Sequence, residues 1–309
     1  MQEPALEHPA LDELVTLRDI LRFAVSRFNA AKLIYGHGTA NAVDEAAFMV
    51  LEGLSLPIDD VNPWADARIT RAERAKLLEL IEARIATRKP APYLLGKAYV
   101  GGLGFKVDER VIIPRSYLAE LLTNGTLGPD GLGLIDDPST VSSVLDLCTG
   151  SGCLAIIAAL AFPEAHVDAV DLSADALAVA SANVETYELT ERVRLRAGDL
   201  FGPLRQRRYD LIITNPPYVA RAEVDAFPPE YAAEPMLAHL GGEDGLDLVR
   251  RILAEAPDYL TDQGALLCEI GTGRHLIEDE FPDLNFTWLD SENSDGEVFW
   301  ISAEELGLG

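Results

Sequence analysis

The chain has 309 residues, of which 48% are hydrophobic and 25% are charged. These values are typical of globular proteins, and the length suggests one large domain or two of ordinary size. The longest apolar run, residues 153–162, is about half the ~20 residues that span a bilayer, so we expect no membrane segment. Residues 1–4 lack the basic start of a secretory signal, and the three cysteines form no CxxC pair. We therefore expect a cytoplasmic protein.

The net charge of −26 is distributed unevenly along the chain. Residues 1–110 carry 14 Lys and Arg against 16 Asp and Glu, whereas residues 111–309 carry 11 against 35. An anionic surface repels phosphate backbones and attracts basic proteins, so we expect a basic protein partner and no direct binding of nucleic acid. The alternative, that the acidity serves only solubility or a salty cytoplasm, stays open.

The N-terminal part of the chain follows the helical period of 3.6 residues. Helices are expected over residues 11–28 and 43–54, and a third is expected to begin at Thr70. Thr70 with Glu73 forms a capping box, and the Lys89-Pro90 step ends this helix. The pattern predicts a helical domain over residues 1–92.

Residues 93–140 are expected to connect two domains. The β-prone runs 97–100 and 105–113 flank Gly101-Gly102, which predicts a hairpin. A short helix over 117–122 follows, and the Gly-, Pro- and Asp-rich stretch 124–138 predicts a surface linker.

Apolar strands and helices alternate over residues 141–309, which predicts an α/β domain with a parallel-type sheet covered on both faces. Strands are expected over 143–148, 166–172, 193–197, 209–214, 265–270, 286–289 and 298–301. Helices are expected over 154–162, 174–187, 246–259 and 274–281. The last two strands lack an intervening helix, so we expect a hairpin with one antiparallel strand at the edge.

The loop after the first strand of this domain has the composition of a ligand-binding turn. It reads Asp146-Leu147-Cys148-Thr149-Gly150-Ser151-Gly152, where glycines permit close approach to a ligand and the next helix offers unpaired N–H groups. Asp171 follows Gly150 by 21 residues, a spacing that suits a carboxylate binding a ribose diol. There is no GxGxxG, and Asp146 would repel a pyrophosphate but attract the sulfonium and ammonium of S-adenosylmethionine. A tight turn without a ligand is the structural alternative.

Two further turns follow strands of the same sheet. After the third strand, Asp199 is a candidate acceptor for an adenine amino group and Leu200 a candidate to pack on the ring; the alternative is an ordinary surface turn. After the fourth strand comes Asn215-Pro216-Pro217-Tyr218, a rigid corner that ends the strand. The Asn215 side-chain oxygen and the Pro216 carbonyl could orient an amide-type nitrogen, with Tyr218 packed on the planar group. A rigid proline turn with no chemistry is the alternative.

These motifs resemble the class I, Rossmann-like methyltransferases, and more narrowly the HemK-type protein-glutamine methyltransferases. The resemblance covers nearly the whole chain and includes Pro114-Arg115, the turn at residues 215–218, the segment 241–246 and Glu269-Ile270-Gly271. It implies S-adenosylmethionine as cofactor, bound by Cys148 to Gly152, by Asp171 and the adjacent Leu172, by Leu200 and by Asn215. It implies that residues 215–218 hold a glutamine amide.

Within that family, Tyr35-Gly36-His37-Gly38-Thr39 and Cys148 are similar to the branch acting on the third large-subunit ribosomal protein. Residues 114–119 depart from the Pro-Arg-Pro-Glu-Thr-Glu of the branch that acts on release factors, which disfavours that substrate. Because mature ribosomes are coated with RNA, the resemblance implies a basic ribosomal protein methylated before or during assembly.

Two other function classes are compatible with some of these residues. Methylation of amino groups in DNA or RNA bases shares the Asn-Pro-Pro-Tyr turn but needs a basic groove or a flipped-base platform, and the sequence has no sign of either. A cofactor-binding assembly factor without catalysis is the other. The scattered histidines show no metal-ligand spacing, so no metal is expected.

Overall fold

A computed structural model describes residues 8–205, 207–291 and 294–307. The chain forms two compact units. One comprises the chain up to Lys97 together with Pro228–Ala233, and the other comprises Ala98–Phe227 and the chain from Glu234 onward. No helix within the described ranges has both the length and the apolar character needed to cross a membrane.

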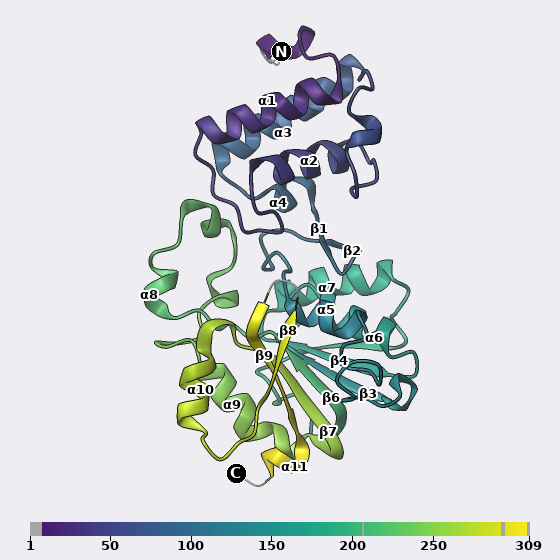
Figure 1. The fold of residues 1–309 in the computed structure, drawn as a ribbon, viewed down its shortest axis with the longest axis vertical. Helices are drawn as coiled ribbons and strands as arrows, with labels where there is room; N and C mark the ends of the chain where they lie inside the picture. Colours follow the sequence, from purple (N-terminus) through teal and green to yellow (C-terminus); the bar gives the residue numbers. More distant parts are fainter. Residues whose placement is uncertain (1–7, 206, 292–293, 308–309) are drawn as a thin grey trace. The chain divides into compact units, whose positions relative to one another are not determined.

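The N-terminal unit is helical, as the periodicity predicts (Figure 1). Its elements are η1 (Pro9–Asp12), α1 (Leu17–Ala30), α2 (Ala42–Gly53), η2 (Asn62–Trp64), α3 (Arg71–Thr87) and α4 (Ala91–Leu95). The prediction of a single helix over 11–28 is wrong. The 3-10 helix η1 ends at Asp12, and a capping box of Thr16 and Asp19 begins α1 as a separate helix. The capping box predicted at Thr70 and Glu73 is confirmed.

A segment from far along the chain completes this unit. The 3-10 helix η4 (Pro229–Ala233) places the fully buried Glu230 carboxylate where it accepts a hydrogen bond from the Ile34 N–H at 2.9 Å and pairs with Arg88. The neighbouring Tyr231 ring lies 4.3 Å from the ring of His37, which is buried. Nothing in the local sequence around residue 230 indicates that this segment packs in the N-terminal unit.

The predicted hairpin forms, with shorter strands than expected. Its strands are β1 (Lys97–Val100) and β2 (Leu103–Lys106). The expected second run, 105–113, is wrong because the chain turns after β2. There the Asp108 side chain accepts a hydrogen bond from the Arg110 N–H at 3.1 Å, and the Asp108 carbonyl accepts one from the Val111 N–H at 3.1 Å.

The second unit contains a seven-stranded sheet with the order β5-β4-β3-β6-β7-β9-β8. Its strands are β3 (Ser143–Leu147), β4 (His166–Asp171), β5 (Val193–Ala197), β6 (Tyr209–Thr214), β7 (Leu260–Glu269), β8 (Thr287–Ser291) and β9 (Ser294–Ser302). The strands β3 to β7 are parallel, and β9 is antiparallel to both of its neighbours. The antiparallel strand therefore lies inside the sheet, and the prediction that it forms the edge is wrong.

Burial explains why β9 takes the inner position. Val298, Phe299 and Ile301 of β9 are fully buried, as suits a strand paired on both sides. In β8 only Leu289 is buried, and such a strand is suited to the edge.

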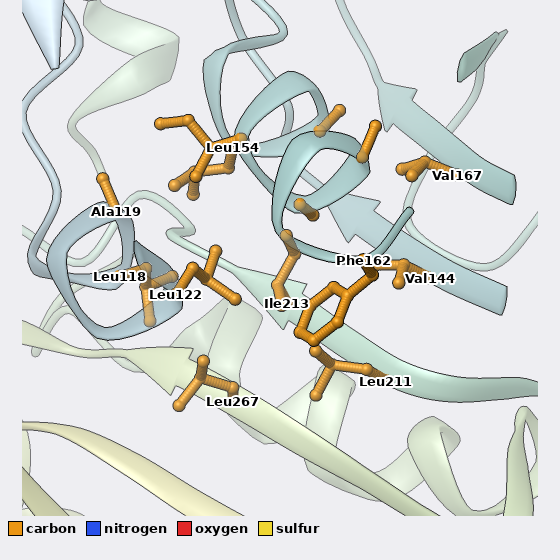
Figure 2. Packing of buried hydrophobic residues seen from close by; sticks show 14 of the residues in the cluster. Leu118, Ala119, Leu122, Val144, Leu154, Phe162, Val167, Leu211, Ile213 and Leu267 are labelled. Atoms are coloured by element: carbon orange, nitrogen blue, oxygen red, sulfur yellow. The ribbon is translucent and has the colours of Figure 1, made fainter. Parts of the chain in front are cut away.

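Helices cover both faces of the sheet, as predicted (Figure 1). Their bounds are α5 (Tyr117–Thr123), η3 (Pro138–Thr140), α6 (Cys153–Ala161), α7 (Ala174–Thr186), α8 (Arg221–Val224), η5 (Met236–Ala238), α9 (Asp247–Glu255), η6 (Ala256–Asp258), η7 (Gly271–Gly273), α10 (Arg274–Glu280) and α11 (Ala303–Leu306). On one face α5 and α6 pack against the strands, and Figure 2 shows Leu118, Leu154, Phe162 and Ile213 in that core. On the other face α9, α10 and α11 bury a second core.

The stretch 124–138, predicted as a surface linker, is attached to the domain. Most of its residues are exposed, but Leu127 and Ile135 are buried in the core beside α5 and α6. The Ile135 N–H donates to the Leu127 carbonyl at 2.8 Å, so these two anchors also hold each other. The stretch is a packed loop.

Candidate active site

The parallel strands end at one edge of the sheet, and a cavity of about 520 Å³ opens there. This volume lies within the range of about 300–1,000 Å³ that is common for small-molecule sites. Eight of the residues singled out in the sequence line it: Cys148, Gly150, Asp171, Leu172, Asp199, Leu200, Asn215 and Pro217. The remaining candidates, Asp146, Thr149, Ser151, Gly152, Pro216 and Tyr218, are not among its lining residues.

The loop between β3 and α6 is shaped by backbone bonds and a left-handed turn. Cys148, Gly150 and Gly152 all have positive φ, at 58°, 55° and 79°. A side chain at Gly152 would come within 3.1 Å of the Ala180 Cβ, so this position also requires a small residue. The Thr149 N–H donates to the Val170 carbonyl at 3.0 Å, which ties the loop to β4.

Asp171, at the end of β4, holds the same loop. One carboxylate oxygen accepts from the Gly150 N–H and the other from the Ser173 N–H, each at 2.8 Å. Burial raises the pKa of this carboxyl, although the backbone N–H donors oppose the shift. Each oxygen retains a further lone pair, so Asp171 can still accept hydrogen bonds from a ligand diol at the cavity wall.

Asp146 lies beneath the loop and is fully buried. Thr149 Oγ1 donates to its Oδ2, and the Ala155 backbone N–H also stabilises the carboxylate, while Oδ1 is buried and makes no hydrogen bond of normal geometry within the described residues. Burial raises the pKa of Asp146 to about 7. A buried carboxylate oxygen without a donor is unfavourable unless a ligand satisfies it, and a cationic group such as the ammonium of S-adenosylmethionine fits this need.

The third turn contributes Asp199 and Leu200. Leu200 is buried and has a φ of 43°, a conformation that is uncommon for a leucine. Asp199 is exposed and pairs with Arg251 of α9 at 2.8 Å, so one of its oxygens is already bonded. Sequence reasoning missed Arg251 and also Arg110, which lines the cavity too.

The turn after β6 contains the partly buried Asn215 and the buried Pro216. Asn215 Nδ2 donates to the Arg115 carbonyl at 3.4 Å, which assigns the side-chain oxygen to the opposite direction. Within the described part of the chain, neither Asn215 Oδ1 nor the Pro216 carbonyl receives a hydrogen bond. Two acceptors of this turn are therefore available beside the cavity that Asn215 and Pro217 line.

Distant residues support this turn. Tyr218 Oη donates to the Glu269 carboxylate at 3.0 Å, and burial, more than Glu269, raises the pKa of this tyrosine. A Cβ at Gly245 would lie 2.3 Å from the Tyr218 carbonyl oxygen, and one at Gly241 would lie 2.6 Å from that of Pro217. These contacts give a physical reason for the glycines of the 241–246 segment.

A metal-binding cluster is not found in the ranges that the structure describes, since no three His, Cys, Asp or Glu side chains gather to form one. The cavity wall instead offers carboxylates, backbone groups and apolar side chains. Such a lining suits an organic ligand of mixed polarity.

The chain is similar in sequence to known methyltransferases. Residues 134–228 match the family model of the methyltransferase small domain. The ribosomal protein uL3 glutamine methyltransferase of Bradyrhizobium diazoefficiens is 58% identical over 304 residues, covering 98% of this chain and 95% of the relative. The protein of the same name from Bordetella pertussis is 53% identical, covering 95% and 97%. The chain belongs to the ribosomal protein uL3 glutamine methyltransferase family.

Membership of this family makes the protein an enzyme that uses S-adenosylmethionine, as the sequence resemblance implies. The HemK-type resemblance and the class I methyltransferase sheet with its N-terminal helical region are likewise confirmed. Among solved structures, a methyltransferase from Pyrococcus furiosus is similar with a TM-score of 0.47 and 16% identity, covering 72% of this chain and 96% of that one.

Proposed function

We propose that this methyltransferase transfers a methyl group from S-adenosylmethionine to the side-chain amide nitrogen of a glutamine in ribosomal protein uL3. The names of the relatives identify the substrate class. The observation that carries the chemistry is the pair of acceptors without hydrogen bonds, Asn215 Oδ1 and the Pro216 carbonyl, in a turn whose Asn215 and Pro217 line the cavity.

The cofactor is assigned to the loops after β3, β4 and β5. Residues 148–152 hold its methionine end, and the Asp146 carboxylate beneath this loop attracts the ammonium. Asp171 and Leu172 hold the ribose, and Asp199 with Leu200 holds the adenine. When bound, the cofactor supplies an electrophilic methyl group on a cationic sulfur.

The chain's own contribution is to orient a poor nucleophile. The lone pair of an amide nitrogen is delocalised into its carbonyl, so the nitrogen attacks only when it is well placed and its charge is stabilised. Asn215 Oδ1 and the Pro216 carbonyl accept hydrogen bonds from the two N–H groups of the substrate amide. They thereby stabilise the positive charge that develops on the nitrogen. Tyr218 packs on the plane of the carboxamide and fixes its tilt. Formation of the N–CH₃ bond would break the methyl–sulfur bond, whose electron pair stays on sulfur and leaves S-adenosylhomocysteine as the product. One N–H proton then leaves to solvent, and the amide regains its planarity.

The two-part chain suits a protein substrate. We assign substrate recognition to the helical domain, residues 1–92, connection to residues 93–140, and catalysis to residues 141–309. The acidity of residues 111–309 favours a basic ribosomal protein and disfavours direct binding of nucleic acid. The substrate is thus the free protein or an early assembly intermediate in the cytoplasm.

Mass spectrometry of purified components tests the proposal. In separate reactions that all contain S-adenosylmethionine, the enzyme is incubated with one of four substrates. These are free uL3, a peptide chain release factor, assembled large ribosomal subunits, and a DNA or RNA duplex. We expect a single methyl addition on one glutamine of free uL3 and little or none on the others. Equal methylation of assembled subunits would contradict the timing, and methylation of the release factor or of bases in place of uL3 would contradict the substrate.

A further inference from the structure

The buried carboxylate of Glu269 connects three parts of the second unit. Glu269 is the last residue of β7, and only 1% of it is exposed. Its Oε1 accepts from Tyr218 Oη at 3.0 Å. Its Oε2 accepts from Ser116 Oγ at 2.7 Å and from the Tyr117 N–H at 3.1 Å. All three bonds are donated to Glu269.

These donors connect Glu269 to both ends of the Asn-Pro-Pro-Tyr turn. Tyr218 is the last residue of the turn, so its bond to Glu269 fixes one end directly. Ser116 and Tyr117 follow Arg115, whose carbonyl accepts the bond from Asn215 Nδ2 at the other end. Glu269 thereby constrains Tyr218 through one bond and the orientation of the Asn215 amide through a short stretch of backbone.

Other contacts make this stretch of backbone rigid. The Arg115 guanidinium forms a bidentate pair with the buried Glu234 carboxylate, with both N–O distances at 2.8 Å. Glu234 also accepts from the Ile113 N–H at 2.9 Å. Two buried glutamates thus clamp residues 113–117, one on each side of the Arg115 carbonyl.

The position of Glu269 separates it from cofactor binding. It is not among the residues that line the cavity. Its burial opposes ionisation and raises the pKa of the carboxyl to about 7 despite three hydrogen bonds, with Glu297 adding repulsion. The other titratable groups facing it are Tyr218 and Tyr117, and burial raises the pKa of each. A charge buried at such a cost to folding indicates a role other than stability.

We propose that Glu269 is a positioning residue for methyl transfer, which sets the tilt of Tyr218 and the orientation of Asn215. This inference rests on the proposed function, in which these two residues bind the glutamine carboxamide. Glu269 does not touch the substrate. It acts through the turn, so its loss lowers turnover and leaves the cofactor site intact.

The geometry distinguishes a positioning role from a need for negative charge. In Glu269→Gln, the amide oxygen can accept from Ser116 and from the Tyr117 N–H, while the amide nitrogen donates to Tyr218 Oη. The three contacts persist with one of them reversed. Glu269→Ala removes all three contacts, and Tyr218 is then held by its ring packing alone.

The test compares Glu269→Ala and Glu269→Gln with the wild type on free uL3. A matched control is Glu305→Ala, which removes a carboxylate from the capping box of α11. We expect Glu269→Ala to lower kcat by about 100-fold or more, with KM for uL3 and cofactor affinity changed less than about threefold. Glu269→Gln should stay within about tenfold of the wild-type kcat, because position is retained.

Two results would overturn the proposal: a wild-type kcat in Glu269→Ala, or a loss in Glu269→Gln as large as in Glu269→Ala. If Glu269→Ala does not fold, Tyr218→Phe takes its place, since it removes the bond to Oε1 without leaving a large cavity. We expect Tyr218→Phe to lower kcat by about tenfold, and an unchanged kcat would contradict the inference. If the wild type itself does not methylate uL3, the proposed function fails, independently of Glu269.

Discussion

The two halves of the cavity are built in different ways. The half that we assign to the cofactor consists of turns that directly follow β3, β4 and β5, and neighbouring turns hold one another, as in the bond from the Gly150 N–H to Asp171. The half formed by the Asn-Pro-Pro-Tyr turn is held from far along the chain, by the Arg115 carbonyl and the Glu269 carboxylate.

Because of this difference, we expect that substitutions can change cofactor affinity and kcat separately. Under the proposed assignment, a change in the cofactor half alters residues that contact the cofactor and therefore its affinity. A change behind the turn moves only the groups that orient the substrate amide, and the cofactor affinity stays the same.

The largest effect is expected for Asn215→Ala, which removes one of the two acceptors for the substrate amide. We expect kcat to fall by about 10²–10³-fold, as when one preorganised hydrogen-bonding group is lost from an active site. Cofactor binding, measured by calorimetry, should change little, and the exposed Asn285→Ala serves as a matched control. A full loss of cofactor binding in Asn215→Ala would show that the two halves are not separable.

Gly271→Ala tests the support behind Tyr218. The new Cβ would lie 2.7 Å from Tyr218 Cε2, so the ring must move. Because small displacements of a positioning group can lower rates by about 100-fold, we expect a loss of that order in kcat.

Gly102→Ala is the matched control for backbone strain. Gly102 and Gly271 both have positive φ, at 77° and 55°, but nothing lies within 4 Å of the Cβ position at Gly102. Both variants carry the conformational cost of a side chain there, and only Gly271→Ala moves the ring. Equal kcat values for the two variants would refute the role of the Tyr218 contact.

Asp146→Asn tests the cofactor half through the pH dependence of cofactor binding. The pKa of Asp146 is about 7, so the carboxylate is charged above this pH and loses its attraction for an ammonium below it. We expect the cofactor Kd of the wild type to rise as the pH falls from 8 to 6. The variant should have a pH-independent Kd, about tenfold weaker than the wild type at pH 8. A parallel pH dependence in the variant would exclude Asp146 as its source.

The same variant should be more stable than the wild type in the absence of cofactor. The pKa of Asp146 in the folded state is above its ordinary value, so the folded protein binds this proton more tightly than the unfolded chain. Stability from this group is present at low pH and is lost as the pH rises through 7. Thermal denaturation at pH 8 should therefore give a higher Tm for Asp146→Asn, and a lower Tm would contradict the cost of the buried charge.

The smallest effect is expected for Asp199→Ala. Asp199 is exposed and paired with Arg251, and exposed ion pairs contribute about 0–1 kcal/mol. We expect the cofactor Kd to rise by about two- to fivefold with kcat unchanged. A change in kcat with an unaltered cofactor Kd would contradict the assignment of Asp199 to the cofactor half.

The sequence predicts the periodic elements and the turns that follow them well, and it predicts breaks within a periodic run and distant contacts poorly. The capping box at Thr70, the strands of the parallel sheet and the turns at its edge follow from local spacing. The inner position of β9 depends on which strand buries more apolar surface, and the new start of α1 depends on a capping box within an amphipathic run. Local periodicity does not show either of them.

The candidate site shows the same limit. Asn215 and Asp171 stand out because each ends a strand in a recognisable pattern. The partners that fix Asn215 are 100 residues away at Arg115, and Tyr218 depends on Glu269, 51 residues away. The motif at 269–271 marked this region without indicating what it contacts.

The central claim is that the turn presents two acceptors to an amide beside the cofactor's methyl group. A crystal structure of the enzyme with S-adenosylmethionine tests it most directly. We expect the methyl carbon to point toward Asn215 Oδ1 and the Pro216 carbonyl, with the adenine near Leu200. A methyl group directed away from Asn215 would contradict the assignment of this turn as the site of methyl transfer.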